Sequence, residues 1–149
     1  YGYRSSQAKG VEETYVLSRS EGFGPEVKRR IMAGTFVLSQ GYYDAYYTKA
    51  QKGRRLMKNA TDAIFNSVDV LLLPTTPTTA FEIGAIKDPI QMYLQDIFTV
   101  HANITGNPAL SIPFKTHTNG MPYGIQIMSN RFDEDQLFNF AKFLEEITI

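Results

Sequence analysis

The chain has 149 residues, of which 43% are apolar and 13% aromatic, and its 15 Lys and Arg side chains balance 15 Asp and Glu. This length suits one domain with its own core, and the apolar fraction excludes a disordered tail or a collagen-like chain. No apolar run approaches the roughly 20 residues of a membrane span. The sequence has no Cys, which excludes disulfides, thiol nucleophiles and thiolate zinc sites. We therefore expect a cytoplasmic protein without a membrane segment.

Charge is unevenly distributed along the chain. Residues 1–60 contain eleven Lys and Arg against five Asp and Glu, whereas residues 61–149 contain four against ten. Five basic residues occur between Asp44 and Asp62 without an acid among them: Lys49, Lys52, Arg54, Arg55 and Lys58. Such a run could attract nucleic acid or an acidic partner, but a solvated helix face explains it more simply. No RNA-recognition motif accompanies it.

The first 66 residues are predicted to be mainly helical. Apolar residues at helical spacing predict a helix over about residues 7–19, followed by a glycine-containing loop at 20–24. Pro25 suits the first turn of a second helix, because its missing N–H has no partner there in any case. Gly41 is expected to break or bend this element, after which the helical period continues to about Asn66.

The pattern changes after this helical half. Residues 68–73 are almost continuously aliphatic, which predicts a short strand buried on both faces. A polar loop at 75–79 follows, a position that often borders a site at a sheet edge, although hydroxyls that satisfy local backbone groups explain it equally well. Asp88 is the predicted N-cap of an apolar helix over about 89–105, which Gly106 can close.

The last third of the chain predicts a hairpin and a helix. Residues 109–114 and 123–128 have strand character, and the turn signal at 119–120 favours antiparallel pairing between them. Asp133 and Gln136 stand at capping-box spacing before a final amphipathic helix.

Long helices alternating with short strands predict an α/β fold with a narrow sheet. So few strands leave edges that need further strands or another chain, and the chain opens at Tyr1 rather than Met. We therefore expect the chain to be a fragment, residues 1–149 forming one segment of a larger domain.

The sequence contains no recognisable catalytic signature. It has no phosphate-binding loop, dinucleotide fingerprint, zinc spacing or nucleophile elbow. His101 and His117 are isolated, which argues against a metal site. Asp133 and Asp135 could form a carboxylate pair, but helix capping explains them better.

Asp96 says more about a possible ligand site than these residues do. Within the predicted helix 89–105 it is the only side chain with a formal charge, and it shares a predicted face with Met92, Thr99 and Asn103. So apolar a helix should be buried, and a buried carboxylate needs a cation or several donors. Asp96 is therefore either a member of a structural ion pair or part of a ligand pocket.

Two arginines lie just inside the start of a predicted helix, an unfavourable position for positive charge. Arg29 and Arg30 follow a helix start, where positive charge opposes the helix dipole. The compensating negative charge could be Glu26, another acid or a bound carboxylate. If an Arg and Asp96 met in one pocket, they would suit a free α-amino acid, but the sequence does not show that they meet.

Several stretches resemble the carboxyl-terminal part of the amidase signature family, and among its members the glutaminase subunits of tRNA-dependent amidotransferases. They include S-E-G-F-G-P-E-V-K-R-R-I at 20–31, G-Y-Y-D-A-Y-Y at 41–47, D-V-L-L-L-P-T-T-P-T at 69–78 and N-I-T-G-N-P-A-L-S-I-P at 103–113. Further matches lie at 49–56, 88–100, 120–128 and 131–135, so the resemblance covers nearly the whole chain.

This resemblance implies an α/β/α fold and hydrolysis of an amide by two serines and a lysine in a Gly/Ser-rich core. The chain contains no such Gly/Ser stretch, so the catalytic residues would lie upstream and the isolated chain should be inactive. The family holds glutamine with an arginine and an aspartate, which correspond to Arg29, or less readily Arg30, and to Asp96. His101 stands where relatives usually carry an apolar residue, and we assign it no role.

The implied parent enzyme releases ammonia from glutamine, and a B subunit uses it, with ATP and Mg, to convert Glu-tRNA(Gln) to Gln-tRNA(Gln). A C subunit joins the two, and no cofactor belongs to this chain. Two alternatives remain open: a family member that cleaves a different amide, and a non-catalytic module that binds tRNA or a protein through residues 49–58.

Overall fold

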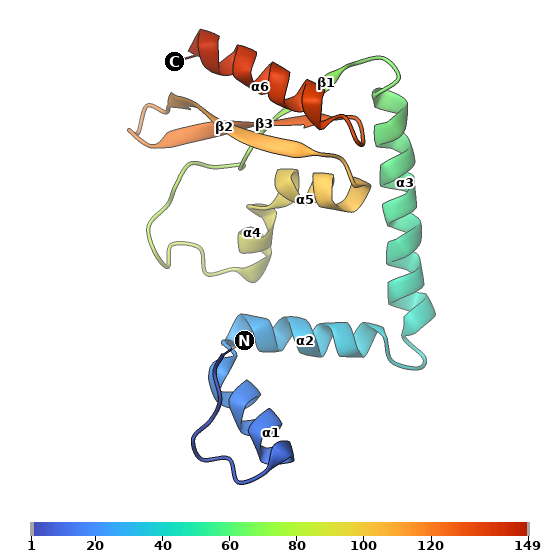
Figure 1. Cartoon of the computed structure of the whole chain (residues 1–149), viewed down its shortest axis with the longest axis vertical. Helices are drawn as coiled ribbons and strands as arrows, with labels where there is room; N and C mark the ends of the chain where they lie inside the picture. Colours follow the sequence, from blue (N-terminus) through green and yellow to red (C-terminus); the bar gives the residue numbers. More distant parts are fainter. Residues whose placement is uncertain (1, 149) are drawn as a thin grey trace. The chain divides into compact units, whose positions relative to one another are not determined.

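The computed structural model describes residues 2–148, and for residue 148 its backbone only. The chain divides into two compact units, Tyr1–Gln51 and Lys52–Ile149. Helix α3, Lys49–Ile64, begins in the first unit and continues into the second (Figure 1). Within the described residues, none of the helices is both long and apolar enough to cross a membrane.

The first unit contains helices α1, Val11–Gly22, and α2, Pro25–Val37. The helix predicted at 7–19 therefore starts and ends later, and the predicted loop at 20–24 is wrong for residues 20–22. The ring of Tyr3 packs against Gly22 so closely that a Cβ there would lie 2.8 Å from the ring. Because glycine alone leaves room for the ring, the chain segment before α1 can lie against its last turn. Pro25 begins α2 as predicted.

An aromatic cluster follows α2. Gly41 has a φ of +88° and interrupts the helical path as predicted. The rings of Phe36, Tyr42 and Tyr46 lie within contact of one another, with the first two centroids 4.3 Å apart. The π-helical turn η1, Asp44–Thr48, then leads into α3. These ring contacts join the end of α2 to η1.

The second unit is built on a three-stranded antiparallel sheet in the order β1-β3-β2. Its elements after α3 are β1 (Val70–Pro74), α4 (Pro89–Leu94), α5 (Ile97–Thr105), β2 (Ala109–Thr116), β3 (Pro122–Ser129) and α6 (Glu134–Thr148). The predicted α/β class and the hairpin of β2 and β3 are confirmed, with Ile112 opposite Ile125 in the register. Gly124 is required in β3, because a Cβ there would lie 2.9 Å from the carbonyl oxygen of Ile112.

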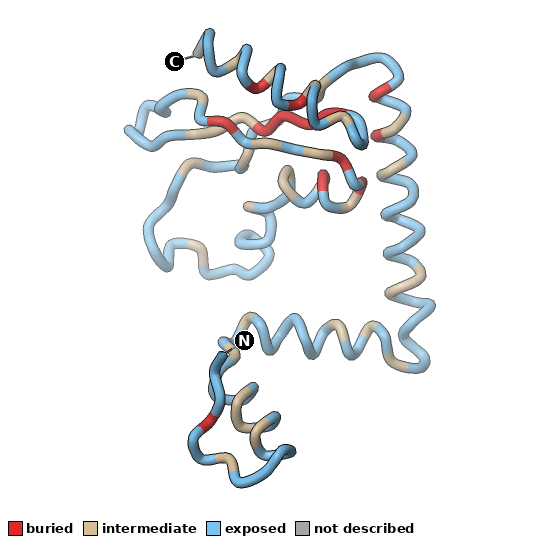
Figure 2. Tube along the Cα trace, viewed as in Figure 1, coloured by how far each residue is buried: buried red, intermediate tan, exposed pale blue. Residues whose placement is uncertain are grey.

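Each face of the sheet is covered by helices (Figure 1). On one face α6 packs through Leu137 and Ala141 against Ile112 and Ile127. On the other face Met128 packs in a second cluster, with Phe65 and Ala102. Ile127 and Met128 are adjacent in β3 and point to opposite faces of the sheet, and because both faces are covered, both residues are 0% exposed. Figure 2 shows buried residues along the central strand of this sheet.

Two burial expectations are wrong for this chain. Strand β1 was expected to be buried on both faces, but its Leu72 is 47% exposed. The physical reason is that Leu72 lies opposite Ile127 on the face covered by α6, but α6 packs mainly on β2 and β3, and β1 is the edge strand beyond them. The predicted apolar helix 89–105 is also largely exposed, and α4 contains no buried residue. Its predicted ends are confirmed: Asp88 Oδ1 accepts a hydrogen bond from Ile90 N, and Gly106 has a φ of +80°.

An ion pair on α3 links stability to pH. Lys58 Nζ donates to Asp62 Oδ2 one turn later. This hydrogen bond, with the added charges of Lys58, Arg131 and Arg55, holds the pKa of Asp62 below its ordinary value of 3.8, against the opposing effect of burial. A carboxyl group with a lowered pKa stabilises the fold above its unfolded-state pKa, and this stabilisation is lost as the pH falls through the folded-state pKa.

Asp62→Asn is therefore expected to destabilise the fold at neutral pH, and this difference should shrink and vanish as the pH is lowered below 3.8. Urea unfolding of both proteins across this pH range measures it. Asp69→Asn, an exposed aspartate of the same unit, is the matched control and should change little. A loss of stability for Asp62→Asn that stays constant with pH would contradict the prediction.

Candidate functional site

Asp96 lies at a break between two helices rather than within one. Helix α4 ends at Leu94 and α5 begins at Ile97, so the prediction of one continuous helix is wrong. At the break the backbone N–H groups of Gln95 and Asp96 each donate three residues back, to Met92 and Tyr93. This tighter turn ends α4, and Asp96 takes the N-cap position of α5 with φ −95° and ψ 4°.

The break changes what the Asp96 side chain can do. Its backbone oxygen accepts from Val100 N at 2.9 Å and from Thr99 Oγ1 at 3.1 Å. Its carboxylate makes no capping hydrogen bond and is exposed in this chain, so the expected burial is wrong. A carboxylate that is not used in capping keeps its acceptor sites for a donor from outside the helix.

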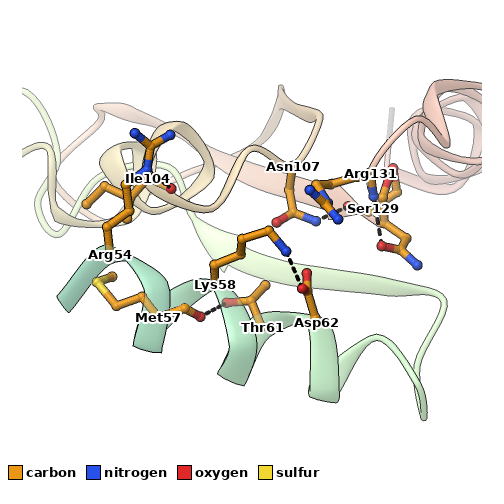
Figure 3. Close-up of polar contacts among 10 residues, drawn as sticks. Arg54, Met57, Lys58, Thr61, Asp62, Ile104, Asn107, Ser129 and Arg131 are labelled. Carbon is orange, nitrogen blue, oxygen red and sulfur yellow. Dashed lines mark hydrogen bonds and ion pairs between the residues drawn. The ribbon is translucent and has the colours of Figure 1, made fainter. Parts of the chain in front are cut away.

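Three hydrogen bonds from other elements hold α5. Gln126 Nε2, from β3, donates to Phe98 O at 3.0 Å. From α3, Arg54 Nε donates to Ile104 O at 2.9 Å, and Thr61 contacts His101 (Figure 3 shows the side chains of Arg54, Thr61 and Ile104). Helix α5, and with it the N-cap residue Asp96, is therefore attached to both the sheet and α3.

His101 has a structural contact that the sequence did not indicate. Thr61 is 2% exposed, and its hydroxyl donates to Met57 O at 3.0 Å (Figure 3). The same Oγ1 lies 2.9 Å from His101 Nε2. A hydroxyl has one proton to donate, so if that of Thr61 goes to Met57 O, the contact predicts that Oγ1 accepts from His101 and that His101 carries its proton on Nε2. Sequence spacing could not reveal this contact, because its partners lie 40 residues apart.

The second predicted site residue, Arg29, lies on α2 in the first unit. Arg29 Nη1 lies 2.5 Å from Glu26 Oε2, and Arg30 Nε lies 2.9 Å from Glu26 Oε1. All three side chains are about half exposed or more. Glu26 thus provides the negative charge expected near these cations, one of the alternatives that the sequence left open. The meeting of Arg29 with Asp96, which belongs to the second unit, stays a prediction.

Two cavities of the second unit have polar linings. One, of about 500 Å³, lies between α5 and the sheet and is lined in part by Thr99, Asn103, Asn107 and Gln126. Asn107 Nδ2 donates to Ser129 O (Figure 3), while its Oδ1 is buried and has no partner among residues 2–148. The other, of about 410 Å³, lies beside the predicted polar loop 75–79. Among the same residues, no cluster of three or more His, Cys, Asp or Glu could hold a metal ion.

Similarity to known proteins extends over nearly the whole chain. Residues 2–138 match the family model described as Amidase. The chain is 53% identical over 141 residues to the A subunit of the glutamyl-tRNA(Gln) amidotransferase of Vesicomyosocius okutanii, a match that covers 95% of this chain and 29% of that protein. The chain therefore spans less than one third of the length of this relative.

Solved structures of similar proteins also match nearly the whole of this chain and about a third of their own length. The A subunit of the glutamyl-tRNA(Gln) amidotransferase of Thermotoga maritima superposes with a TM-score of 0.63 at 47% identity, over 85% of this chain and 28% of that one. A crystal structure described as an amidase gives a TM-score of 0.72 at 24% identity, over 93% of this chain and 32% of that one, and supports the fold alone.

The contact between Thr61 and His101 predicts the effect of a substitution. Thr61→Val keeps the shape of the side chain but removes the acceptor for His101 and the donor to Met57, so we expect a loss of about 1–3 kcal/mol in the free energy of unfolding. Denaturant unfolding measures this loss. Nitrogen NMR of the wild type should show a proton on Nε2 of His101, and a neutral His101 protonated on Nδ1 would contradict the assignment.

Proposed function

The chain belongs to the amidase family, and from this premise we propose that it is part of the glutamine-hydrolysing subunit of a tRNA-dependent amidotransferase. The observation that carries the proposal is its identity of 47% and 53% to two proteins named as the A subunit of glutamyl-tRNA(Gln) amidotransferase. Within that enzyme the segment recognises glutamine and supplies no nucleophile.

Glutamine recognition requires a cation and an anion, because the substrate is a zwitterion. We assign the Asp96 carboxylate to the α-ammonium group of glutamine, since capping leaves its oxygens unused. Arg29 takes the α-carboxylate through its planar guanidinium, which can hold two oxygens at once. The ammonium and carboxylate ends would then be held apart from the side-chain amide, which remains accessible to the nucleophile.

Arg29 and Arg30 both contact Glu26, so the choice of Arg29 rests on the resemblance of residues 20–31 to the family, and the contact with Glu26 only makes that role possible. An exposed ion pair contributes little stability, so Arg29 can turn from Glu26 to a ligand at small cost. Arg30 contacts the other oxygen of the same carboxylate. When Arg29 binds the ligand, Glu26 therefore keeps a cationic partner and is not left as an unpaired charge beside the substrate carboxylate.

The remaining chemistry belongs to other parts of the proposed enzyme. A serine nucleophile, a second serine and a lysine outside this segment would cleave the amide and release ammonia. A B subunit would use the ammonia, with ATP and Mg, to convert Glu-tRNA(Gln) to Gln-tRNA(Gln) in the cytoplasm, and a C subunit would join the two. No cofactor is assigned to this chain.

A second candidate function is RNA or protein binding through residues 49–58, and the contacts on α3 count against it. Arg54 donates to Ile104 O and Lys58 pairs with Asp62. Asp62 offsets the charge of Lys58, and Arg54 keeps its charge but has its Nε donor engaged by Ile104 O, so the run offers a polyanion fewer available cationic groups.

The clamp is tested in the full-length enzyme. Asp96→Ala should raise the KM for glutamine by at least about tenfold, because a hydrogen bond to a charged group is lost, and should change kcat less. Arg29→Ala should act similarly, whereas Arg30→Ala, the matched control, should have a smaller effect. Steady-state glutaminase assays measure both constants. Unchanged use of glutamine by Asp96→Ala would remove the clamp.

The isolated 149-residue chain is expected to hydrolyse no glutamine, because the proposed nucleophile and its lysine lie outside it. Ammonia release by the purified chain, measured beside a full-length enzyme of the family as a positive control, tests this. Measurable turnover by the purified chain would contradict the assignment of catalysis to other residues.

A further inference from the structure

The break that carries Asp96 is attached on both sides to the sheet and its loops. One residue before Asp96, the side chain of Gln95 accepts a hydrogen bond at Oε1 from Thr78 Oγ1 at 2.8 Å. Two residues after it, Phe98 O accepts from Gln126 Nε2 at 3.0 Å. Both donors come from segments distant in sequence, so neither contact follows from the local helical pattern.

The loop that provides Thr78 is itself fixed to the sheet. Thr75 N donates to Gly124 O at 3.1 Å, and Thr75 Oγ1 lies 2.6 Å from Ser111 Oγ. At the other end of the loop, Asn119 Nδ2 donates to Thr79 Oγ1 at 2.9 Å. Because residues on both sides of Thr78 are bonded to the hairpin of β2 and β3, its hydroxyl holds Gln95 at a defined place relative to the sheet.

The second donor, Gln126, is held more rigidly than Thr78, because it lies in the sheet itself. It is 4% exposed and lies in the central strand, on the face that also carries Met128. Met128 packs with Ala102 of α5. The hydrogen bond to Phe98 O therefore fixes the first turn of α5 next to a packed apolar contact.

We propose that Thr78 and Gln126 are positioning residues, which hold the break at residues 95–96 so that Asp96 meets the α-ammonium group of the substrate. This inference rests on the proposed role of Asp96. A charge-assisted hydrogen bond depends on its geometry, and α4 has only six residues, none of them buried. Without these two attachments, the break would be held only through the later turns of α5, where Arg54 and Thr61 bind, and the Asp96 carboxylate could move relative to the sheet.

The test compares two substrates in the full-length enzyme: glutamine, and glutaramate, which has the same carboxylate and amide but lacks the α-amino group. Thr78→Val should raise the KM for glutamine by about fivefold, the effect of losing one ordinary hydrogen bond, with little change in kcat. The KM for glutaramate should stay unchanged, because that substrate has no ammonium group for Asp96 to hold. A loss of stability alone would affect both substrates equally.

Three further variants make the test specific. Thr78→Ser keeps the hydroxyl and should leave the KM for glutamine at the wild-type value. Thr118→Val, which changes an exposed threonine of the hairpin turn in the same way, should alter neither substrate. Gln126→Met removes the second donor with a side chain of similar length and should again raise the KM for glutamine selectively.

Combination with Asp96→Ala separates this inference from the proposed function. In that background Thr78→Val should have no further effect on glutamine, because the group that it positions is gone. If Asp96→Ala affects glutamine selectively but Thr78→Val and Gln126→Met do not, the positioning role is overturned and the clamp stands. If Asp96→Ala affects the two substrates equally, the role of Asp96 fails, and the inference fails with it.

Discussion

The second unit depends on the packing of one strand. Strand β3 pairs with β1 on one side and β2 on the other, and its adjacent residues Ile127 and Met128 are fully buried on opposite faces. Ile127 packs against α6. Met128 packs with Ala102 of α5 and with Phe65, which directly follows α3. A strand in this position fixes the helices on both sides at once, because a shift by one residue would exchange the two faces.

The candidate site uses this strand as its support. Gln126 points to the same face as Met128 and binds the first turn of α5, while Thr61 and Arg54 attach the later turns to α3. The carboxylate of Asp96 lies at the end of the helix that these contacts hold. The candidate site therefore combines an exposed carboxylate with attachments of which those from Gln126 and Thr61 are partly buried and that from Arg54 is exposed, an arrangement that limits the motion of the carboxylate without covering it.

The main departure from the sequence-based predictions is that apolar side chains of β1 and α4 are exposed. The exposed positions are not scattered but belong to particular elements. Leu72 of the edge strand and much of α4 are exposed, whereas the two clusters around β3 are buried. The chain spans 29% and 28% of the length of two of its relatives. Within the proposed enzyme, the remaining part of the polypeptide would provide the strands and helices that cover these surfaces, which accounts for apolar sequences in β1 and α4 that stay exposed here.

The sequence by itself determined several local features of the structure. The helix starts at Pro25 and Asp88, the stop at Gly106 and the hairpin before Tyr123 depend on backbone restrictions of single residues or on hydrogen bonds between near neighbours, which a sequence displays directly. It also identified Asp96 as an unusual charge, but placed it within a helix. Only the tertiary structure decided that α4 and α5 are separate, that His101 meets Thr61, and that Thr78 and Gln126 contact residues on either side of Asp96. These contacts join residues 17 to 40 positions apart, and long-range hydrogen bonds leave no periodic pattern in the chain.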